Sequence, residues 1–367
     1  MDPTIVVLGA TGYTGGLVVE SLVRRGRRPV LAGRSPQRLA VVAARHGGLD
    51  TRIADVASAA TVRDLLAPGD VLVTTVGPFE RYGRAAAQAA AEVGAHYVDT
   101  TGEVGFVQHL RDRYDEVARG HGATMLPAFG YDFVPGVLAG TLAAEKAGSA
   151  ADTLRVGYYA IGSVARGLSS GTRATLADGL LVPVIVRRDG VLTTARAASA
   201  VYAPTVRGSR RSSFLVSGTE SLFLPEHFPQ LRTVEVFNGW FPRASRALGA
   251  ASWAVNGLAR WTWGRRLVEA GGKAATRSTG GPDAAERART RTHVVAQVTG
   301  ASGRVVSEVH LEGPSIYSLT GELVALAADR LASGGALRSG VVSPADAFGA
   351  DGLREACAAI GLEVVPR

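Results

Sequence analysis

Residues 5–15 read IVVLGATGYTG, in which four apolar residues run directly into a turn with glycines at positions 9, 12 and 15. The apolar run predicts a buried strand, and the spacing of apolar residues after Gly12 predicts a helix. Glycines between a strand and a helix allow a tight turn and let bare backbone N–H groups approach a pyrophosphate. The helix N-terminus adds a positive end for the anion. We therefore expect a dinucleotide site formed by Gly9, Thr11, Gly12, Tyr13, Thr14 and Gly15.

The first third of the chain repeats this strand and helix pattern at regular intervals, which is typical of a parallel sheet. Ser35-Pro36 predicts the N-cap and first turn of the second helix. The expected strands are 5–8, 29–32, 51–53, 71–76, 97–98 and 124–126, with later helices at 61–66, 83–93 and 106–119. Six strands with intervening helices predict a doubly wound α/β domain of the Rossmann type.

Beyond residue 135 the pattern changes to strand-like runs with few crossover helices. These runs are 154–161, 181–186, 193–201, 234–237, 293–299 and 304–311. They predict a second, α+β domain built on a mixed or antiparallel sheet. A loop is expected at 271–286 and a helix at 320–331. The expected domains are 1–135 for the cofactor, 136–314 for substrate or dimerisation, and 315–367 returning to the first domain.

Composition excludes several classes of protein. The 367 residues are 46% hydrophobic and 20% charged, which excludes global disorder, collagen and coiled coil. No apolar stretch has the length of a membrane span, so we expect a cytoplasmic protein. The net charge is +8, but all but two of the 40 basic residues are scattered arginines, so we expect no nucleic-acid partner. Cys357 is the single cysteine and the seven histidines fall singly, so we expect no metal.

The end of the second expected strand indicates which dinucleotide binds. NAD-preferring Rossmann domains usually place an acidic residue there, but this chain has Gly33-Arg34-Ser35. A guanidinium can pair with a 2′-phosphate, and Ser35 and Arg38 are close enough in sequence to assist. We therefore expect NADP(H) rather than NAD(H). The alternative is a solvated Arg34 and relaxed specificity.

Other candidate residues follow the later strands. Asp55 is either a neighbour of the adenine or a helix-capping residue. Ligands of doubly wound sheets bind beyond the carboxyl ends of the strands, and the turn 76–79 follows the fourth strand. Segments 97–103 and 129–136 should lie on the same rim. The turn residues expected beside the nicotinamide half are Val76, Gly77, Pro78 and Phe79.

Hydride chemistry needs a proton donor or polariser on this rim. The candidates are Tyr82, Asp99, Glu103, Tyr131 and Asp132, of which we favour Tyr131, then Tyr82 and Asp132, as catalytic residues. Asp132 has an alternative structural interpretation, as an acceptor of backbone N–H bonds at the next helix start. His227, in an expected loop, is a further candidate. No Ser/His/Asp arrangement is visible, which argues against a hydrolase.

All four tryptophans lie between Trp240 and Trp263, beside five arginines. Three interpretations remain open. The segment is a domain or homodimer interface, the wall of a site for an acyl substrate, or a peripheral membrane contact.

Taken together, these motifs resemble the saccharopine dehydrogenase-like reductases, including the bacterial branch of trans-acting enoyl reductases. The resemblance covers about the first 140 residues, and in the second domain only 169–172 and 342–348 are similar. It departs at Phe133, where relatives carry a small hydroxyl residue, and at Ser170, where they carry glycine, so the family's substrate is not transferred. The segments that carry it are 9–15, 32–34, 76–79, 82–83, 97–103, 130–132 and Pro135.

The resemblance implies an NADP-binding Rossmann domain, a second domain that covers the nicotinamide, and hydride transfer to a polarised double bond. Our first hypothesis is an NADPH-dependent reductase acting on C=C or C=N of a small or lipid-like metabolite. The alternatives are a saccharopine-type amino-acid dehydrogenase acting on a secondary amine, and a redox-silent NADP-binding sensor or scaffold.

Overall fold

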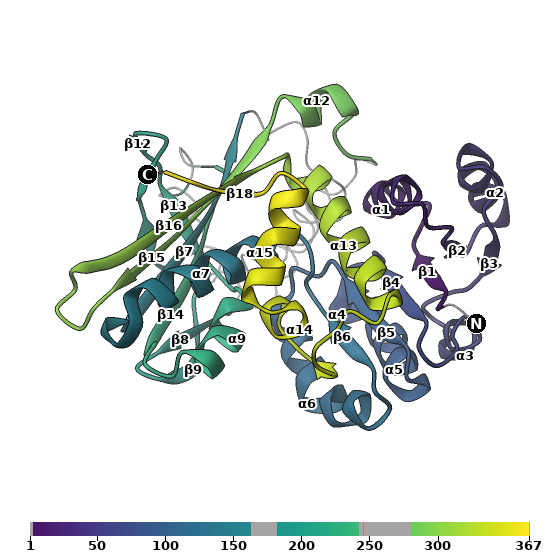
Figure 1. Ribbon diagram of the computed structural model, residues 1–367, viewed down its shortest axis with the longest axis horizontal. Helices are drawn as coiled ribbons and strands as arrows, with labels where there is room; N and C mark the ends of the chain where they lie inside the picture. The colour runs from purple at the N-terminus through teal and green to yellow at the C-terminus, as the bar shows by residue number, and fades with distance from the viewer. Residues whose placement is uncertain (1–2, 163–181, 242–244, 246–279, 367) are drawn as a thin grey trace, which may run out of the picture. The chain divides into compact units, whose positions relative to one another are not determined.

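A computed structural model of the chain describes residues 3–162, 182–241, 245 and 280–366 (Figure 1). The chain forms two compact units. The first contains Met1–Val134 and Tyr317–Ile360, and the second contains Pro135–Ile316 and Gly361–Arg367. The last seven residues therefore differ from the expected return of 315–367 to the first domain, because their strand pairs with the sheet of the second unit.

The first unit contains a seven-stranded sheet in the order β17-β6-β5-β4-β1-β2-β3, and every pair in it is parallel. The order reverses between β1 and β4, which is the switch point of a doubly wound sheet. The strands are β1 (Ile5–Leu8), β2 (Val30–Gly33), β3 (Thr51–Ile53), β4 (Val71–Thr74), β5 (His96–Asp99), β6 (Thr124–Leu126) and β17 (Gly340–Val341).

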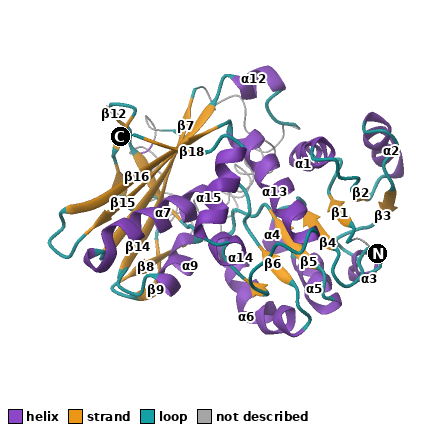
Figure 2. Cartoon of the chain, viewed as in Figure 1, coloured by secondary structure: helices purple, strands orange, loops and turns teal. Residues whose placement is uncertain are grey.

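Helices connect these strands, and Figure 2 shows the alternation of helix and strand. Ser35 caps α2 as expected, because its Oγ accepts a hydrogen bond from the Arg38 N–H at 3.3 Å. The helices are α1 (Tyr13–Arg24), α2 (Pro36–Arg45), α3 (Ala59–Arg63), α4 (Phe79–Tyr82), α5 (Arg84–Val93), α6 (Val104–Gly120), α13 (Ile316–Ala332), α14 (Pro344–Phe348) and α15 (Ala350–Ala359).

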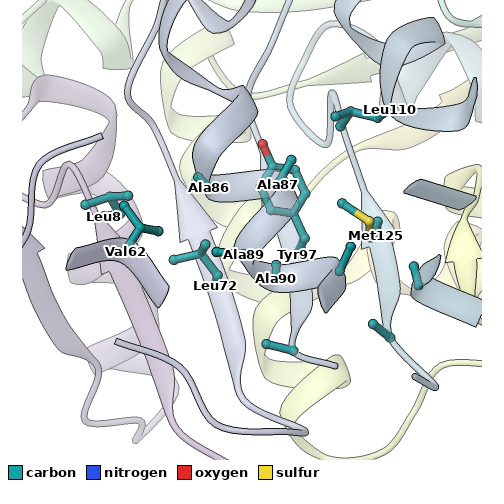
Figure 3. Close-up of a cluster of buried hydrophobic side chains, with 14 of the residues drawn as sticks. Leu8, Val62, Leu72, Ala86, Ala87, Ala89, Ala90, Tyr97, Leu110 and Met125 are labelled. Carbon is teal, nitrogen blue, oxygen red and sulfur yellow. The ribbon is translucent and has the colours of Figure 1, made fainter. Parts of the chain in front are cut away.

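The core of this unit is built from alternate residues of the strands and the inner faces of the helices. Leu8, Leu72 and Tyr97 lie in one buried cluster with Val62 of α3 and the alanines of α5 (Figure 3). Alanine side chains allow α5 to approach the sheet closely, and Tyr97 and Met125 fill the larger spaces. The apolar strands thus fix the positions of the turns that follow them.

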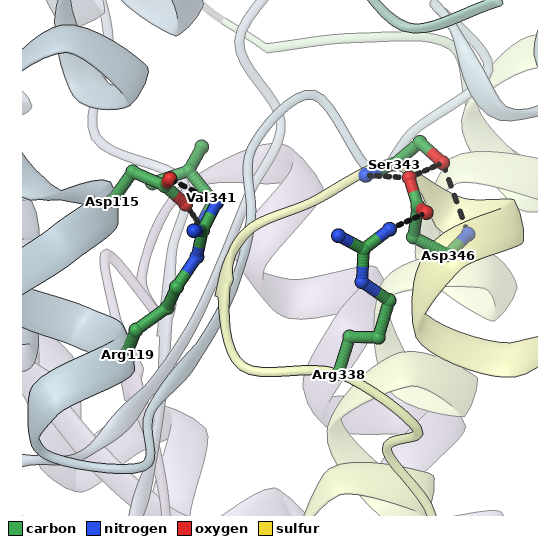
Figure 4. Close-up of polar contacts among 6 residues, drawn as sticks. All are labelled: Asp115, Arg119, Arg338, Val341, Ser343 and Asp346. Carbon is green, nitrogen blue, oxygen red and sulfur yellow. Dashed lines mark hydrogen bonds and ion pairs between the residues drawn. The ribbon is translucent and has the colours of Figure 1, made fainter. Parts of the chain in front are cut away.

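The seventh strand comes from the distant C-terminal part of the chain (Figure 4). The Val341 N–H donates to the Asp115 carboxylate at 2.8 Å, which attaches β17 to α6. Ser343 and Asp346 form a capping box at the start of α14, and Arg338 pairs with Asp346. This strand of two residues is held by backbone hydrogen bonds to the β6 segment and by side-chain contacts at its two ends.

The second unit contains a mixed sheet with the path β10-β13-β14-β7-β15-β16-β18, to which β8 and β9 add beside β14. Among the described strands of this sheet, only the β14–β7 pair is parallel. The strands are β7 (Thr153–Ile161), β8 (Val184–Arg188), β9 (Val191–Ala195), β10 (Val201–Tyr202), β13 (Ser213–Val216), β14 (Thr233–Gly239), β15 (Arg291–Thr299), β16 (Val305–Gly313) and β18 (Glu363–Val365).

Smaller elements complete this unit. A hairpin of β11 (Thr205–Val206) and β12 (Ser209–Arg210) is joined by a turn at Arg207 and Gly208. The helices are α7 (Val134–Ala147), a short 3₁₀ turn (Gly148–Ala150), α9 (Glu220–His227) and α12 (Ala284–Ala288).

The predicted fold class is confirmed: a Rossmann-type parallel sheet and a second α+β unit on a mixed sheet. Three local predictions were wrong. Residues 193–201 form two strands because Ala198 has a φ of +55°, which interrupts extended backbone. Helix α7 was missed, and α12 lies within the expected loop 271–286, where Asp283 and Glu286 form a capping box.

Candidate cofactor and active site

In the turn between β1 and α1, larger residues in place of Gly9 or Gly15 would strain the backbone or clash with it. Gly9 has a φ of +91°, and a Cβ on Gly15 would lie 2.2 Å from the Gly9 carbonyl oxygen. The Gly12 N–H donates to the same carbonyl at 2.9 Å. Helix α1 begins at Gly12 without a side-chain cap and without an acidic residue in its first turn. The turn is therefore compact, and the positive end of α1 is left for an anion.

The turn after β4 lies against this loop at the switch point. A Cβ on Gly9 would lie 2.8 Å from Thr75 Oγ1 and 2.9 Å from Val76 Cγ2. Gly77 and Pro78 follow, joined by a cis peptide bond, and Phe79 opens α4. Val76, Gly77, Pro78 and Phe79 thus occupy the strand end predicted for them. Thr75, which opens this turn but was not among the expected cofactor residues, also contacts the glycine loop.

The cationic side chains after β2 differ in their partners. The Arg38 guanidinium donates to the Thr11 carbonyl oxygen at 3.1 Å, so α2 is joined to the glycine loop. Arg34 is exposed, and no hydrogen bond or ion pair holds it in the described part of the chain. A free guanidinium beside a phosphate-binding turn is the arrangement that a 2′-phosphate requires.

Asp55 holds a turn after β3. Its carboxylate accepts from the Ala57 N–H at 3.0 Å, and its backbone N–H donates to Thr61 Oγ1 at 3.1 Å. The N-cap position of α3 belongs to Ser58. The carboxylate therefore organises the segment between β3 and α3.

Asp99, at the end of β5, is fully buried and joins two strand ends. Its carboxylate accepts from the Tyr97 hydroxyl at 2.7 Å, the Thr101 N–H at 2.9 Å and the Ala128 N–H at 2.8 Å. Burial raises the pKa of Asp99 to about 6, against the lowering effect of these hydrogen bonds. Because its lone pairs are used in this way, Asp99 acts as a structural link between β5 and the segment after β6.

Glu103 has a comparable structural task. Its two carboxylate oxygens accept from the N–H groups of Phe79 and Glu80, each at 2.9 Å. These are N–H groups of the first turn of α4, which carries Tyr82 at its end. Glu103 therefore fixes the turn after β4 and is occupied as an acceptor.

The three predicted catalytic residues lie in different environments. Tyr82 is half-buried, with the Arg81 guanidinium 5.1 Å from its ring centre. The Tyr131 side chain is 1% exposed, and its backbone N–H donates to Thr320 Oγ1 of α13 at 3.1 Å. Thr320 is a second residue that the sequence did not reveal, because it is 189 positions away from its partner.

Asp132 is half-buried beside Tyr131. Burial raises the pKa of its carboxyl group to about 7. Within the described residues, no hydrogen bond reaches this carboxyl group. The alternative interpretation of Asp132 as an acceptor of helix N–H groups thus has no hydrogen bond to support it among those residues. The backbone around it is fixed, since Phe133 N–H donates to Ala128 O and Val134 N–H donates to Gly130 O, both at 3.1 Å.

Two further candidates lie elsewhere. His227 is the last residue of α9 and is exposed, so its expected position in a loop was wrong. Trp240 directly follows β14 and is buried. The tryptophans at 253, 261 and 263 and the motif 169–172 lie outside the described residues. Within the described ranges, no cluster of His, Cys, Asp or Glu is placed to hold a metal, and no helix is long and apolar enough to cross a membrane.

Comparison with known families decides the nature of the first unit. Residues 5–125 match the model of the saccharopine dehydrogenase NADP-binding domain. These residues are therefore similar to a saccharopine dehydrogenase NADP-binding domain. NADP(H) is its cofactor, and the residues of the NADP-binding domain fit that group: a compact glycine turn, an uncapped helix N-terminus and the unpaired Arg34.

Curated relatives match part of this chain. A putative trans-acting enoyl reductase of Mycobacterium tuberculosis is 38% identical over 187 residues, which are 48% of this chain and 44% of the relative. A trans-acting enoyl reductase of Mycobacterium ulcerans is 39% identical over 137 residues, which are 36% of this chain and 33% of the relative. The matches thus span less than half of the length of these relatives.

A solved structure shares the whole fold. The match to the saccharopine dehydrogenase (L-Glu forming) of Saccharomyces cerevisiae spans 99% of this chain and 100% of the chain in that structure. The TM-score is 0.63 and the identity is 13%. The second unit therefore shares its architecture with the corresponding part of that structure, and the identity is too low to carry functional residues across.

Proposed function

We propose that the chain is an NADPH-dependent oxidoreductase that transfers a hydride to a polarised C=C or C=N bond of a small or lipid-like metabolite. The NADP-binding domain supports the cofactor, and relatives named trans-acting enoyl reductases favour C=C. We further propose that the second unit contributes the substrate site. The observation that carries the proposal is the match of residues 5–125 to the NADP-binding domain. Asp132 adds a carboxyl group in the segment after β6, and burial raises its pKa to about 7.

A bound NADPH supplies the hydride, and the acceptor then needs a proton at its other reacting atom. The Asp132 carboxyl group retains a proton up to about pH 7, because burial disfavours its charged form. The fixed backbone from Ala128 to Val134 keeps the carboxyl group in one place, which general acid catalysis requires.

Asp132 is a better proton donor than its neighbour. The hydroxyl of a buried tyrosine has an ordinary pKa near 10, whereas the efficiency of a general acid is greatest when its pKa lies near the working pH. Tyr131 is 1% exposed and Asp132 is half-buried. We therefore assign proton donation to Asp132 and a wall position to Tyr131 and Tyr82.

The test compares Asp132→Asn with Tyr131→Phe in the full chain, by NADPH oxidation with α,β-unsaturated acyl thioesters and with cyclic imines. Loss of a general acid lowers kcat by about 100-fold to 10,000-fold. We expect this loss for Asp132→Asn with NADPH affinity unchanged, and near wild-type kcat for Tyr131→Phe. The wild-type rate should fall above about pH 7, and this fall should be absent in Asp132→Asn.

The same panel separates the competing functions. Turnover of thioesters alone supports an enoyl reductase, and turnover of imines alone supports a saccharopine-type dehydrogenase. Saturable NADPH binding without turnover of either class would contradict the reductase and support a redox-silent sensor. Equal activity of wild type and Asp132→Asn would remove Asp132 from the mechanism.

A further inference from the structure

Two histidines that are 17 positions apart in the sequence meet inside the second unit. His293 of β15 and His310 of β16 are 2% and 3% exposed. The His293 Nε2 and His310 Nδ1 atoms are 2.9 Å apart, so the rings share a hydrogen bond. Neither residue takes part in the function proposed above.

The pair is the centre of a longer chain of hydrogen bonds. His293 Nδ1 lies 2.9 Å from Glu312 Oε1, and His310 Nε2 lies 2.9 Å from Glu308 Oε1. At one end, Arg207 donates to both oxygens of Glu312 at 2.6 and 2.7 Å. At the other end, the amide of Gln297 donates to Glu308 at 2.6 Å.

The three central contacts need three protons. The Arg207 guanidinium holds the pKa of Glu312 down to about 2, so this carboxylate only accepts and His293 Nδ1 must carry a proton. An ionised Glu308 requires a proton on His310 Nε2 in the same way. The hydrogen bond between the rings needs a third proton, whereas two neutral imidazoles together carry only two.

We propose that His293 and His310 form a proton-binding pair, which holds one extra proton at neutral pH and ties the β11–β12 hairpin to the sheet. The tie runs through Arg207, which stands in the hairpin turn with a φ of +50°, an uncommon conformation for a residue with a side chain. Val206 of the same hairpin is buried against Tyr159 and Val295. Loss of the proton leaves two nitrogen lone pairs facing each other at 2.9 Å, and the hairpin loosens.

The two carboxylates that contact the pair favour an extra positive charge on it. In the described part of the chain, the carboxylates of Glu308 and Glu312 contact the pair, and Arg207 contacts Glu312. The other titratable groups on the neighbouring strand positions are Tyr159, Arg291 and Glu363. One imidazolium and Arg207 neutralise the two contacting carboxylates. Burial lowers the pKa of His293, and the hydrogen bond to Glu312 opposes that lowering.

The sign of the pH effect follows from proton linkage. A free histidine loses its proton near about pH 6.5. The proposal requires the native pair to keep its extra proton above that pH. The stability that it contributes is complete below about pH 6.5 and is lost as the pH rises through the pair's own value.

The first test observes the imidazole nitrogens of the wild-type full chain by ¹⁵N NMR at about pH 7, close to the ordinary histidine pKa. We expect one ring of the pair to be protonated on both nitrogens and the other on one nitrogen alone. Two singly protonated rings would overturn the proposal, and this measurement needs no variant.

The second test uses Glu308→Gln. A glutamine accepts from Gln297 through its carbonyl and donates to His310 Nε2 through its amide, so two protons satisfy the chain. In the wild type, we expect hydrogen-exchange protection of β11–β12 and β15–β16 to fall about tenfold between pH 6 and pH 9, after correction for intrinsic exchange, as for the loss of one buried hydrogen bond. Glu308→Gln should remove this fall, and Asp351→Asn, at an exposed ion pair, should keep it. The same fall in wild type and Glu308→Gln would contradict the proposal.

Discussion

Two carboxylates of the first unit and two of the second are held by different kinds of partner. In the first unit, Asp99 and Glu103 are held by backbone N–H groups and a tyrosine hydroxyl, within a few residues of strand ends. In the second unit, Glu235 and Glu312 are paired with arginines from other elements. Backbone donors carry no net charge, so the first unit can leave Arg34 and the Asp132 carboxyl group available for a ligand.

The largest effect should come from the glycine turn. Gly15→Ala places a Cβ 2.2 Å from the backbone oxygen of Gly9, which no side-chain movement can relieve, so we expect saturable NADPH binding to be lost. The matched control is Gly16→Ala in the same helix, where a Cβ meets nothing within 4 Å. Calorimetric titration checks both variants. Equal binding by Gly15→Ala and the wild type would break the assignment of the turn.

A smaller effect is expected at Arg34. Its guanidinium has no partner in the described ranges, so Arg34→Ala removes the 2′-phosphate contact without disturbing the fold. Loss of a charge-assisted hydrogen bond should weaken NADPH binding by about 10-fold to 100-fold, with NADH binding unchanged. Arg45→Ala, at an exposed position of the same helix region, is the control. An unchanged preference between the two cofactors would leave specificity to Arg38 and Ser35.

The pH dependence of stability tests the buried carboxyl groups of the first unit. Burial raises the pKa of Asp99 to about 6 and that of Asp132 to about 7, so the native state keeps protons that the unfolded chain releases near pH 4. The free energy of unfolding should therefore fall as the pH rises from about 4 to about 7. Asp99→Asn and Asp132→Asn should each reduce this fall in urea unfolding. The same pH dependence in the wild type and in both variants would contradict the shifts.

The smallest effect is expected in the second unit. Glu235 is 10% exposed, but its partners Arg155 and Arg188 are 38% and 42% exposed, so solvent screens the pairs. Glu235→Gln should lower the free energy of unfolding by less than about 1 kcal/mol. Glu116→Gln, on the exposed face of α6, should change it by less than about 0.5 kcal/mol. A loss of several kcal/mol would show that these ion pairs behave as buried ones.

The same contrast explains what the sequence could reveal. The strands, the glycine turn and the Ser35 cap of the first unit depend on neighbouring residues, and the sequence predicted them. Helix α7 was missed because nearly all of its residues are buried, so no polar face produced a helical period. The pairs His293–His310 and Tyr131–Thr320 depend on register and packing between distant segments, which local spacing does not encode.

The central claim is that the turn between β1 and α1 binds NADP(H). Calorimetric titration of the purified full chain with NADPH and with NADH tests it most directly. We expect one saturable site for NADPH and binding of NADH that is at least about tenfold weaker, as for one missing charge-assisted contact. No saturable heat with either dinucleotide would contradict the account.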